Sequence, residues 1–192
     1  MIPDREVACR LLAEAEQCNP GPWGDHSRVA ADCAYKIAKA AGMDEEKAYI
    51  FGLLHDIGRK FGVKYLAHVY DGYHYMMELG YEEVARICLT HSFNFQSLDG
   101  YIGNWDIPAE QQKQLQDMLD QLVYDDYDRL IQLCDALAIA DGVVDIETRM
   151  LDVKNRYGYY PQEKWDNNLW LKAYFEEKAG KSIYEIVKNE AV

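Results

Sequence analysis

Apolar side chains recur every three or four residues along most of the chain, a spacing that is typical of amphipathic helices. A first helix is predicted through Val7, Leu11 and Ala15. It must end at residues 19–22, Asn-Pro-Gly-Pro, because proline and glycine do not continue a helix. A second helix is predicted through residues 29–41, and glycine follows at the position that commonly terminates a helix.

The rest of the chain continues this pattern. Asp44 can cap a third helix that runs to Gly58, so that His55 and Asp56 fall in its last turn. Further helices are predicted at residues 66–79, 82–91, 108–124, 130–138, 146–157, 162–178 and 182–188. The alternation typical of strands never lasts long enough to compete. We therefore expect an all-α protein, a compact helical bundle with a single domain over residues 1–192.

One segment, residues 92–106, interrupts the helical period. It carries Phe93, Phe95, Tyr101 and Trp105, and a flexible linker would not hold so many aromatic residues. We expect an ordered loop that covers a pocket.

The pair His55-Asp56 is the strongest chemical signal in the chain. Burying these two side chains after an apolar helix is costly unless something binds them, and a divalent metal ion is the commonest partner. Other residues of ligand type form an ordered series on both sides of the pair. The complete set is His26, His55, Asp56, His68, His91 and Asp135. Four imidazoles and two carboxylates suffice for two metal ions.

This ordered set resembles that of the HD superfamily of metal-dependent phosphohydrolases, which is named for such a His-Asp pair. The resemblance covers about residues 25–140. The segments that carry it are Asp25-His26-Ser27, His55-Asp56-Ile57-Gly58, His68 to Gly80, Leu89-Thr90-His91 and Leu133-Cys134-Asp135-Ala136. The chain departs from some members at Ser92, where they carry a further histidine.

The resemblance implies a helical HD-type bundle with its core at about residues 25–140 and C-terminal helices, 141–192, packed on it. It implies one ion held by His26, His55, Asp56 and Asp135, and a second ion held by His68 and His91, with Asp56 as the bridge. The ions would be divalent: Fe, Mn, Ni, Co, Zn or Mg. The activity implied is cleavage of a small phosphoester by a metal-activated water. A nucleotide or a dinucleotide polyphosphate is the expected substrate.

Cations near the pair are candidates for binding the substrate phosphate. Arg59 and Lys60 directly follow the His-Asp-Ile-Gly segment, and arginine can clamp a phosphate through two hydrogen bonds. We assign Asp56, Arg59 and Lys60 to catalysis, although the two cations could equally pair with the acidic surface. His74 lies six positions after His68, which places it on another helix face. We expect it at the pocket edge or on the surface.

Two features further along the chain remain open. Arg149 vaguely resembles an arginine of dinucleotide polyphosphate hydrolases in the superfamily, but its spacing from Asp135 is longer. Tyr157, Tyr159 and Tyr160 could stack a base, although aromatic residues at a helix boundary more often pack against the protein.

The charge balance narrows the range of partners. The 33 acidic and 20 basic residues give a net charge of -13, which repels a phosphate backbone and argues against long nucleic acids. A small phosphorylated substrate remains compatible, because metal ions and local cations can reverse the field inside one pocket.

Cysteine usage and hydropathy indicate the compartment. The five cysteines are scattered and odd in number, as expected for reduced thiols of a cytoplasmic protein. No apolar leader or membrane-spanning run is evident, so we expect no membrane association. The sequence is also compatible with a homodimer.

Two other functions compete with phosphoester hydrolysis. Mixed-valent di-iron oxygenases of the same superfamily, which cleave inositol or phosphonates, use the same order of ligands. The second alternative is a catalytically silent module that binds metal or nucleotide. The intact set of six ligands argues against this alternative.

Overall fold

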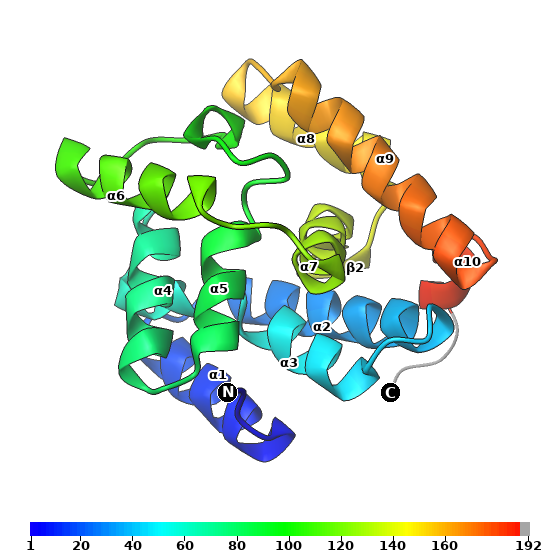
Figure 1. Cartoon of the computed structure of the whole chain (residues 1–192), viewed down its shortest axis with the longest axis horizontal. Coiled ribbons are helices and arrows are strands. Elements are labelled where there is room, and N and C mark those ends of the chain that lie inside the picture. The colour runs from blue at the N-terminus through cyan, green and yellow to red at the C-terminus, as the bar shows by residue number, and fades with distance from the viewer. Residues whose placement is uncertain (189–192) are drawn as a thin grey trace.

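The computed structural model describes residues 1–188, which are almost entirely helical (Figure 1). The first half contains α1 (Arg5–Cys18), α2 (Trp23–Ala40), α3 (Glu45–Leu54), the 3-10 helix η1 (Ile57–Phe61), α4 (Ala67–Glu78) and α5 (Glu82–Thr90). The second half contains the 3-10 helix η2 (Leu98–Gly100), α6 (Ala109–Asp120), α7 (Asp126–Leu137), β1 (Ala138–Ile139), β2 (Gly142–Val143), α8 (Ile146–Tyr157), α9 (Gln162–Ala179) and α10 (Ile183–Lys188). The prediction of an all-α bundle is confirmed.

Three predicted boundaries need correction. The third helix ends at Leu54 rather than at Gly58, and α6 ends at Asp120 rather than at residue 124. Ala138, expected in a helix, instead begins a small antiparallel hairpin in which it pairs with Val143. Each strand has only two residues, too short for any alternation to appear in the sequence.

Helix α2 lies at the centre of the bundle and contacts α3, α7, α9 and α10. Its buried face is built largely from alanines, which allow close approach. Gly52 of α3 makes the closest approach possible, since a Cβ there would lie 2.7 Å from Ala31 Cα. This packing brings the start of α2 next to the end of α3.

A second close contact joins η1 to α4. A Cβ on Gly58 would lie only 2.0 Å from the carbonyl oxygen of His68 and 2.6 Å from the amide nitrogen of Gly72. Only glycine permits this approach. It places the segment after His55 and Asp56 directly against the helix that carries His68.

The core consists of two hydrophobic clusters. The larger one extends from Ala8 to Val187 and contains residues of most helices. The smaller one joins the loop at 92–106 to α4 and α6 through Phe93, Tyr101 and Leu115. The expectation of an ordered loop is therefore confirmed, although Trp105 is exposed.

The C-terminal helices lie along one side of the bundle (Figure 1). Helix α9 contacts α2, α7 and α8, and α10 contacts α2. Within residues 1–188, the helices all lack the combination of length and apolar character that crossing a membrane requires.

Candidate metal centre

The six predicted ligands all lie at or near helix ends. His55 and His91 directly follow α3 and α5, where they occupy the C-cap positions. His26 and His68 lie in the first turns of α2 and α4, and Asp135 lies in the last turn of α7. Helix packing therefore brings together residues from distant parts of the sequence, and their ligand atoms form two groups.

The first group is His26, His55 and Asp135. The Nε2 atoms of the two histidines are 3.2 Å apart. Oδ1 of Asp135 lies 3.0 Å from His26 Nε2 and 3.6 Å from His55 Nε2. Three ligand atoms thus converge on one point.

The second group is Asp56, His68 and His91, all buried. The Nε2 atoms of the two histidines are again 3.2 Å apart. Oδ1 of Asp56 lies 3.1 Å from His68 Nε2 and 3.5 Å from His91 Nε2.

Asp56 connects the two groups. While its Oδ1 atom faces the second group, its Oδ2 atom lies 3.9 Å from His55 Nε2 in the first. Oδ1 is also fully buried without a hydrogen-bond donor. A buried carboxylate oxygen in this condition is costly unless a cation compensates for it.

All four imidazoles are oriented in the same way. Each Nδ1 faces a backbone carbonyl oxygen: Ala138 for His26 at 3.2 Å, Gly52 for His55 at 2.7 Å, Tyr65 for His68, and Cys88 for His91 at 2.9 Å. When Nδ1 donates to a carbonyl, Nε2 of the neutral ring carries the lone pair. This is the arrangement by which proteins orient metal-binding histidines.

The donor set fits divalent metal ions. Within each group, two Nε2 lone pairs face each other at 3.2 Å, and a carboxylate oxygen lies beside them. A proton on one atom could remove the repulsion between one pair of these atoms. A metal cation removes the repulsion among all three ligand atoms of a group at once. Imidazole nitrogen and carboxylate oxygen are ordinary ligands of Zn, Fe, Ni and Mn.

The surrounding charges keep both carboxylates ionised. Burial would raise the pKa of Asp56, but Arg59 and His68 together hold that pKa well below its usual value. Burial would also raise the pKa of Asp135, but the adjacent His26 and His55 rings hold that pKa well below its usual value.

An ion pair between a partly exposed arginine and a buried aspartate supports the position of His91. Arg86 on α5 donates to both carboxylate oxygens of Asp128 on α7, at 2.5–3.2 Å. Asp128 also accepts from the Thr90 hydroxyl at 2.8 Å, and Gln132 donates to the Thr90 carbonyl at 3.1 Å. These contacts fix the end of α5, where His91 follows.

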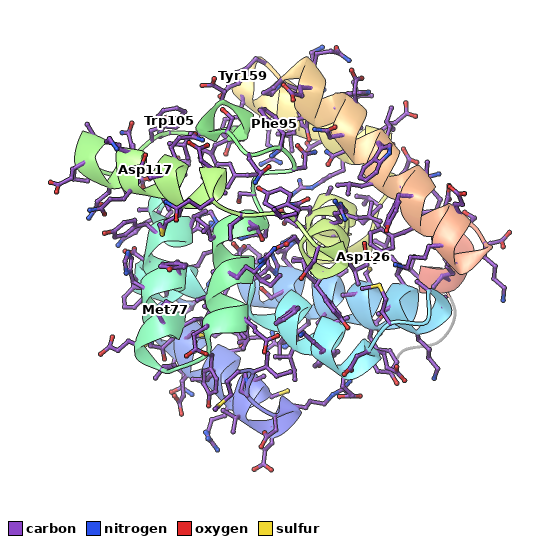
Figure 2. All side chains as sticks on the ribbon, viewed as in Figure 1. Met77, Phe95, Trp105, Asp117, Asp126 and Tyr159 are labelled. Carbon is purple, nitrogen blue, oxygen red and sulfur yellow. The ribbon has the colours of Figure 1, made fainter. Side chains whose placement is uncertain are left out.

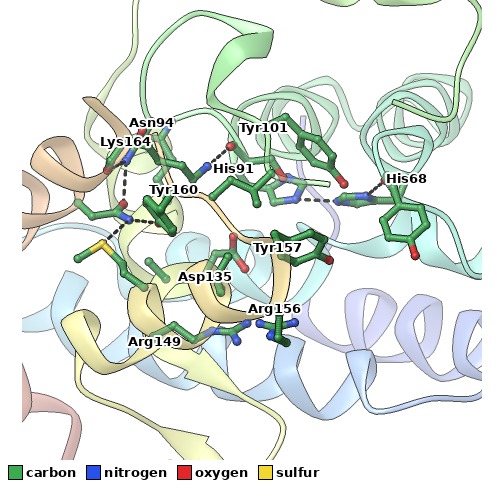
Figure 3. Close-up of a pocket in the computed structure, with 18 of the residues that line it drawn as sticks. His68, His91, Asn94, Tyr101, Asp135, Arg149, Arg156, Tyr157, Tyr160 and Lys164 are labelled. Atoms are coloured by element: carbon green, nitrogen blue, oxygen red, sulfur yellow. Dashed lines mark hydrogen bonds between the residues drawn. The ribbon is translucent and has the colours of Figure 1, made fainter. Parts of the chain in front are cut away.

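A cavity of about 340 Å³ opens beside the two groups (Figure 3), and His68, His91 and Asp135 contribute to its wall. Arg59 also lines the cavity, and its Nε donates to Asp56 Oδ2 at 2.6 Å. Lys60 is not brought to the cavity, because its Nζ lies 3.9 Å over the Tyr75 ring. His74 is exposed between two tyrosines, on the surface.

Other cavity residues were not predicted from the sequence. They include Asn94, Gln132, Arg156, Lys164 and Asn168, while Arg149, Tyr157 and Tyr160, left open above, line the cavity as well. No local motif distinguishes these residues. Asn94 comes from the 92–106 loop and Gln132 from α7, whereas the others reach the cavity because α8, α9 and the turn between them lie beside it.

Lys164 is the most unusual of these residues. Its Nζ donates to the carbonyl oxygen of Ser92 at 2.7 Å. Loss of solvation lowers the Lys164 pKa to about 8, although Asp135 acts in the opposite direction. The side chain is therefore close to the point at which it gains or loses its charge at neutral pH.

Comparison with known proteins gives one result. Searches of the curated proteins and of the solved structures found no significant match. The pattern that describes the HD domain matches residues 23–140, which include all six candidate ligands and more than half of the chain. Together with the helical fold and the paired His/Asp groups, this match shows that the chain belongs to the HD domain family.

Proposed function

We propose that this protein is a metal-dependent phosphohydrolase that cleaves a small phosphoester, with a nucleotide or dinucleotide polyphosphate as the expected substrate. The observation that carries the proposal is the pair of His/Asp groups, joined by Asp56, beside a cavity rich in cationic side chains. In this proposal the six residues hold two divalent ions. Such ions, when bound, stabilise charge on phosphoryl oxygens and lower the pKa of a water molecule.

The protein's own residues would orient the reacting groups. The backbone carbonyls hold all four imidazoles in the tautomer that directs Nε2 inward. Asp56 contributes one oxygen to each side of the centre. Arg59 fixes the Asp56 carboxylate through Oδ2 and also faces the cavity, so it can contact a substrate phosphate with the N–H groups that Asp56 does not use.

Lys60 has a weaker case for a direct role. Its ammonium lies on the Tyr75 ring and not in the cavity. Lys64 does line the cavity, and it pairs with Asp71 at 2.6 Å. The proposal therefore assigns the phosphate contact near Asp56 to Arg59.

The test is phosphate release by protein loaded with Mn²⁺, Co²⁺ or Ni²⁺ under anaerobic conditions, measured over a panel of nucleotides and dinucleotide polyphosphates. A hydrolase requires only a divalent Lewis acid, so we expect turnover of at least one nucleotide without oxygen. Asp56→Ala should abolish turnover. His74→Ala is the matched control, because His74 lies on the surface.

The same experiment examines the oxygenase alternative. An oxygenase must cycle iron and would be inactive with the substituted ions. Absence of phosphate release over the whole panel, together with oxygen uptake by the iron form in the presence of a polyol or phosphonate, would overturn the hydrolase proposal.

A further inference from the structure

The cavity has a charge opposite to that of the whole protein. Five cationic side chains line it, namely Arg59, Lys64, Arg149, Arg156 and Lys164, against one carboxylate, Asp135. The chain as a whole has a net charge of -13. Such a local reversal concentrates anions in one pocket of a protein that otherwise repels them.

The cations fall into two sets. On one wall, each cation has a carboxylate of its own: Arg59 pairs with Asp56 at 2.6 Å, and Lys64 pairs with Asp71 at 2.6 Å. The other wall is formed by the hairpin of α8 and α9, and its cations are not balanced in this way.

Arg149 and Arg156 share a single carboxylate. Asp152, one helical turn from each, lies 3.3 Å from Arg149 and 3.0 Å from Arg156. Asp152 is itself mostly exposed and does not line the cavity. Figure 3 shows the two guanidinium groups beside each other, next to Asp135.

Lys164, from the start of α9, adds a third positive charge. Its ammonium donates to a neutral group, the Ser92 carbonyl, and within residues 1–188 it forms no salt bridge with a carboxylate. Asn94 holds this part of α9 in place by donating to the Lys164 carbonyl and to Asn168 Oδ1, both at 2.8 Å. The hairpin thus contributes three cations and no carboxylate to the lining of the cavity, which gives this wall a surplus of positive charge.

This wall lies outside the part of the chain that matches the HD domain, which ends at residue 140. We infer that the α8–α9 hairpin forms a second anion subsite, and that the substrate carries, besides the phosphate that is cleaved, a further phosphate group bound by Arg149, Arg156 and Lys164. The part of this inference that concerns the substrate rests on the proposed function. A single phosphate held at the two His/Asp groups would leave the charge of the hairpin uncompensated.

The test compares two inorganic probes, tripolyphosphate and orthophosphate, by titration calorimetry of the Mn²⁺-loaded protein after removal of free metal. The variant is Arg149→Gln/Arg156→Gln. Its matched control is Lys154→Gln/Lys181→Gln, which removes the same charge from exposed positions that do not line the cavity. Lys164→Gln is a second, independent variant. Circular dichroism and thermal melting verify that each variant is folded.

We expect the arginine variant and Lys164→Gln each to weaken tripolyphosphate binding by about tenfold or more, because each loses charge-assisted hydrogen bonds to the anion. Orthophosphate binding should change by less than about threefold, and the control should bind both probes as the original protein does. Equal weakening in variant and control, or equal loss of both probes, would overturn the subsite. If the expected pattern appears but no nucleotide is hydrolysed, the subsite stands as a polyphosphate-binding site and the proposed function fails.

Discussion

At the scale of single residues, the orientation of four imidazole rings carries most of the argument for a metal centre. Nδ1 of His26 faces a carbonyl of the β1–β2 hairpin, and Nδ1 of each other ring faces a carbonyl three residues earlier in the chain. The facing Nε2 atoms would repel one another in the absence of a cation. Asp56 lies between the two groups with one oxygen deeply buried, and it is the residue on which a binuclear arrangement depends.

The double substitution His68→Ala/His91→Ala tests the second group. It should reduce the bound metal from about two ions per chain to about one, because His26, His55 and Asp135 remain. Metal analysis by inductively coupled plasma mass spectrometry of protein purified without an affinity tag for metals gives the measurement. His74→Ala should leave the stoichiometry unchanged, and an unchanged value in the double variant would reduce the site to a single ion.

Lys164 predicts a pH dependence with a definite sign. Because its pKa is lowered to about 8, its positive charge is present below that pH and is lost as the pH rises through it. Binding of tripolyphosphate should therefore weaken above about pH 8. In Lys164→Arg the guanidinium stays charged, so that part of the decline should disappear. Identical pH profiles for both proteins would contradict the assignment.

At the scale of helices, close packing at two glycines determines where the ligands meet. Gly52 permits contact between α2 and α3, and Gly58 permits contact between η1 and α4. Gly58 belongs to the His-Asp-Ile-Gly segment that was recognisable in the sequence. The structure supplies the reason for glycine there, which is the carbonyl oxygen of His68.

Gly58→Ala should therefore destabilise the protein by about 3 kcal/mol or more, because the backbone of η1 or α4 must move to admit the methyl group. Metal retention should fall along with stability, as His68 would shift away from Asp56. Chemical denaturation gives the free energy of unfolding. Gly21→Ala is the control, since its Cβ would meet only the Trp23 side chain at 3.3 Å, and equal effects of the two substitutions would contradict this account.

The ion pair between α5 and α7 gives a separate prediction. Asp128→Ala removes a fully buried carboxylate that accepts from Arg86 and Thr90, and should cost about 1.5–3 kcal/mol of unfolding free energy. Asp117→Ala, on α6, removes an exposed carboxylate that pairs with the exposed Lys113 and should cost about 0–1 kcal/mol. A loss at Asp128 no greater than that at Asp117 would show that the pair does not support the end of α5.

At the scale of the whole molecule, sequence and structure were informative about different parts. The helical period predicted the bundle, and the six ligands were recognisable because their residue types and order are specific. The cavity wall on α8 and α9 was not predictable, since Arg156, Lys164 and Asn168 have no local pattern that distinguishes them from surface residues. Their positions depend on how α9 packs against α7 and α2, which requires the fold.

The distribution of charge is also visible only at this scale. Acidic residues outnumber basic ones over the whole chain, with Asp117 of α6 at the surface (Figure 2), whereas five cationic side chains line the cavity. Since one hydrophobic cluster extends from Ala8 to Val187, we propose that the described chain forms one domain. The C-terminal helices would then belong to the substrate-binding unit.

The most direct test of this account is anomalous X-ray diffraction from crystals of the protein loaded with Mn²⁺. We predict two anomalous peaks about 3.5–4 Å apart. One should lie among His26, His55 and Asp135, and the other between His68 and His91, with Asp56 in contact with both. A single peak, or peaks that do not touch Asp56, would contradict the binuclear centre.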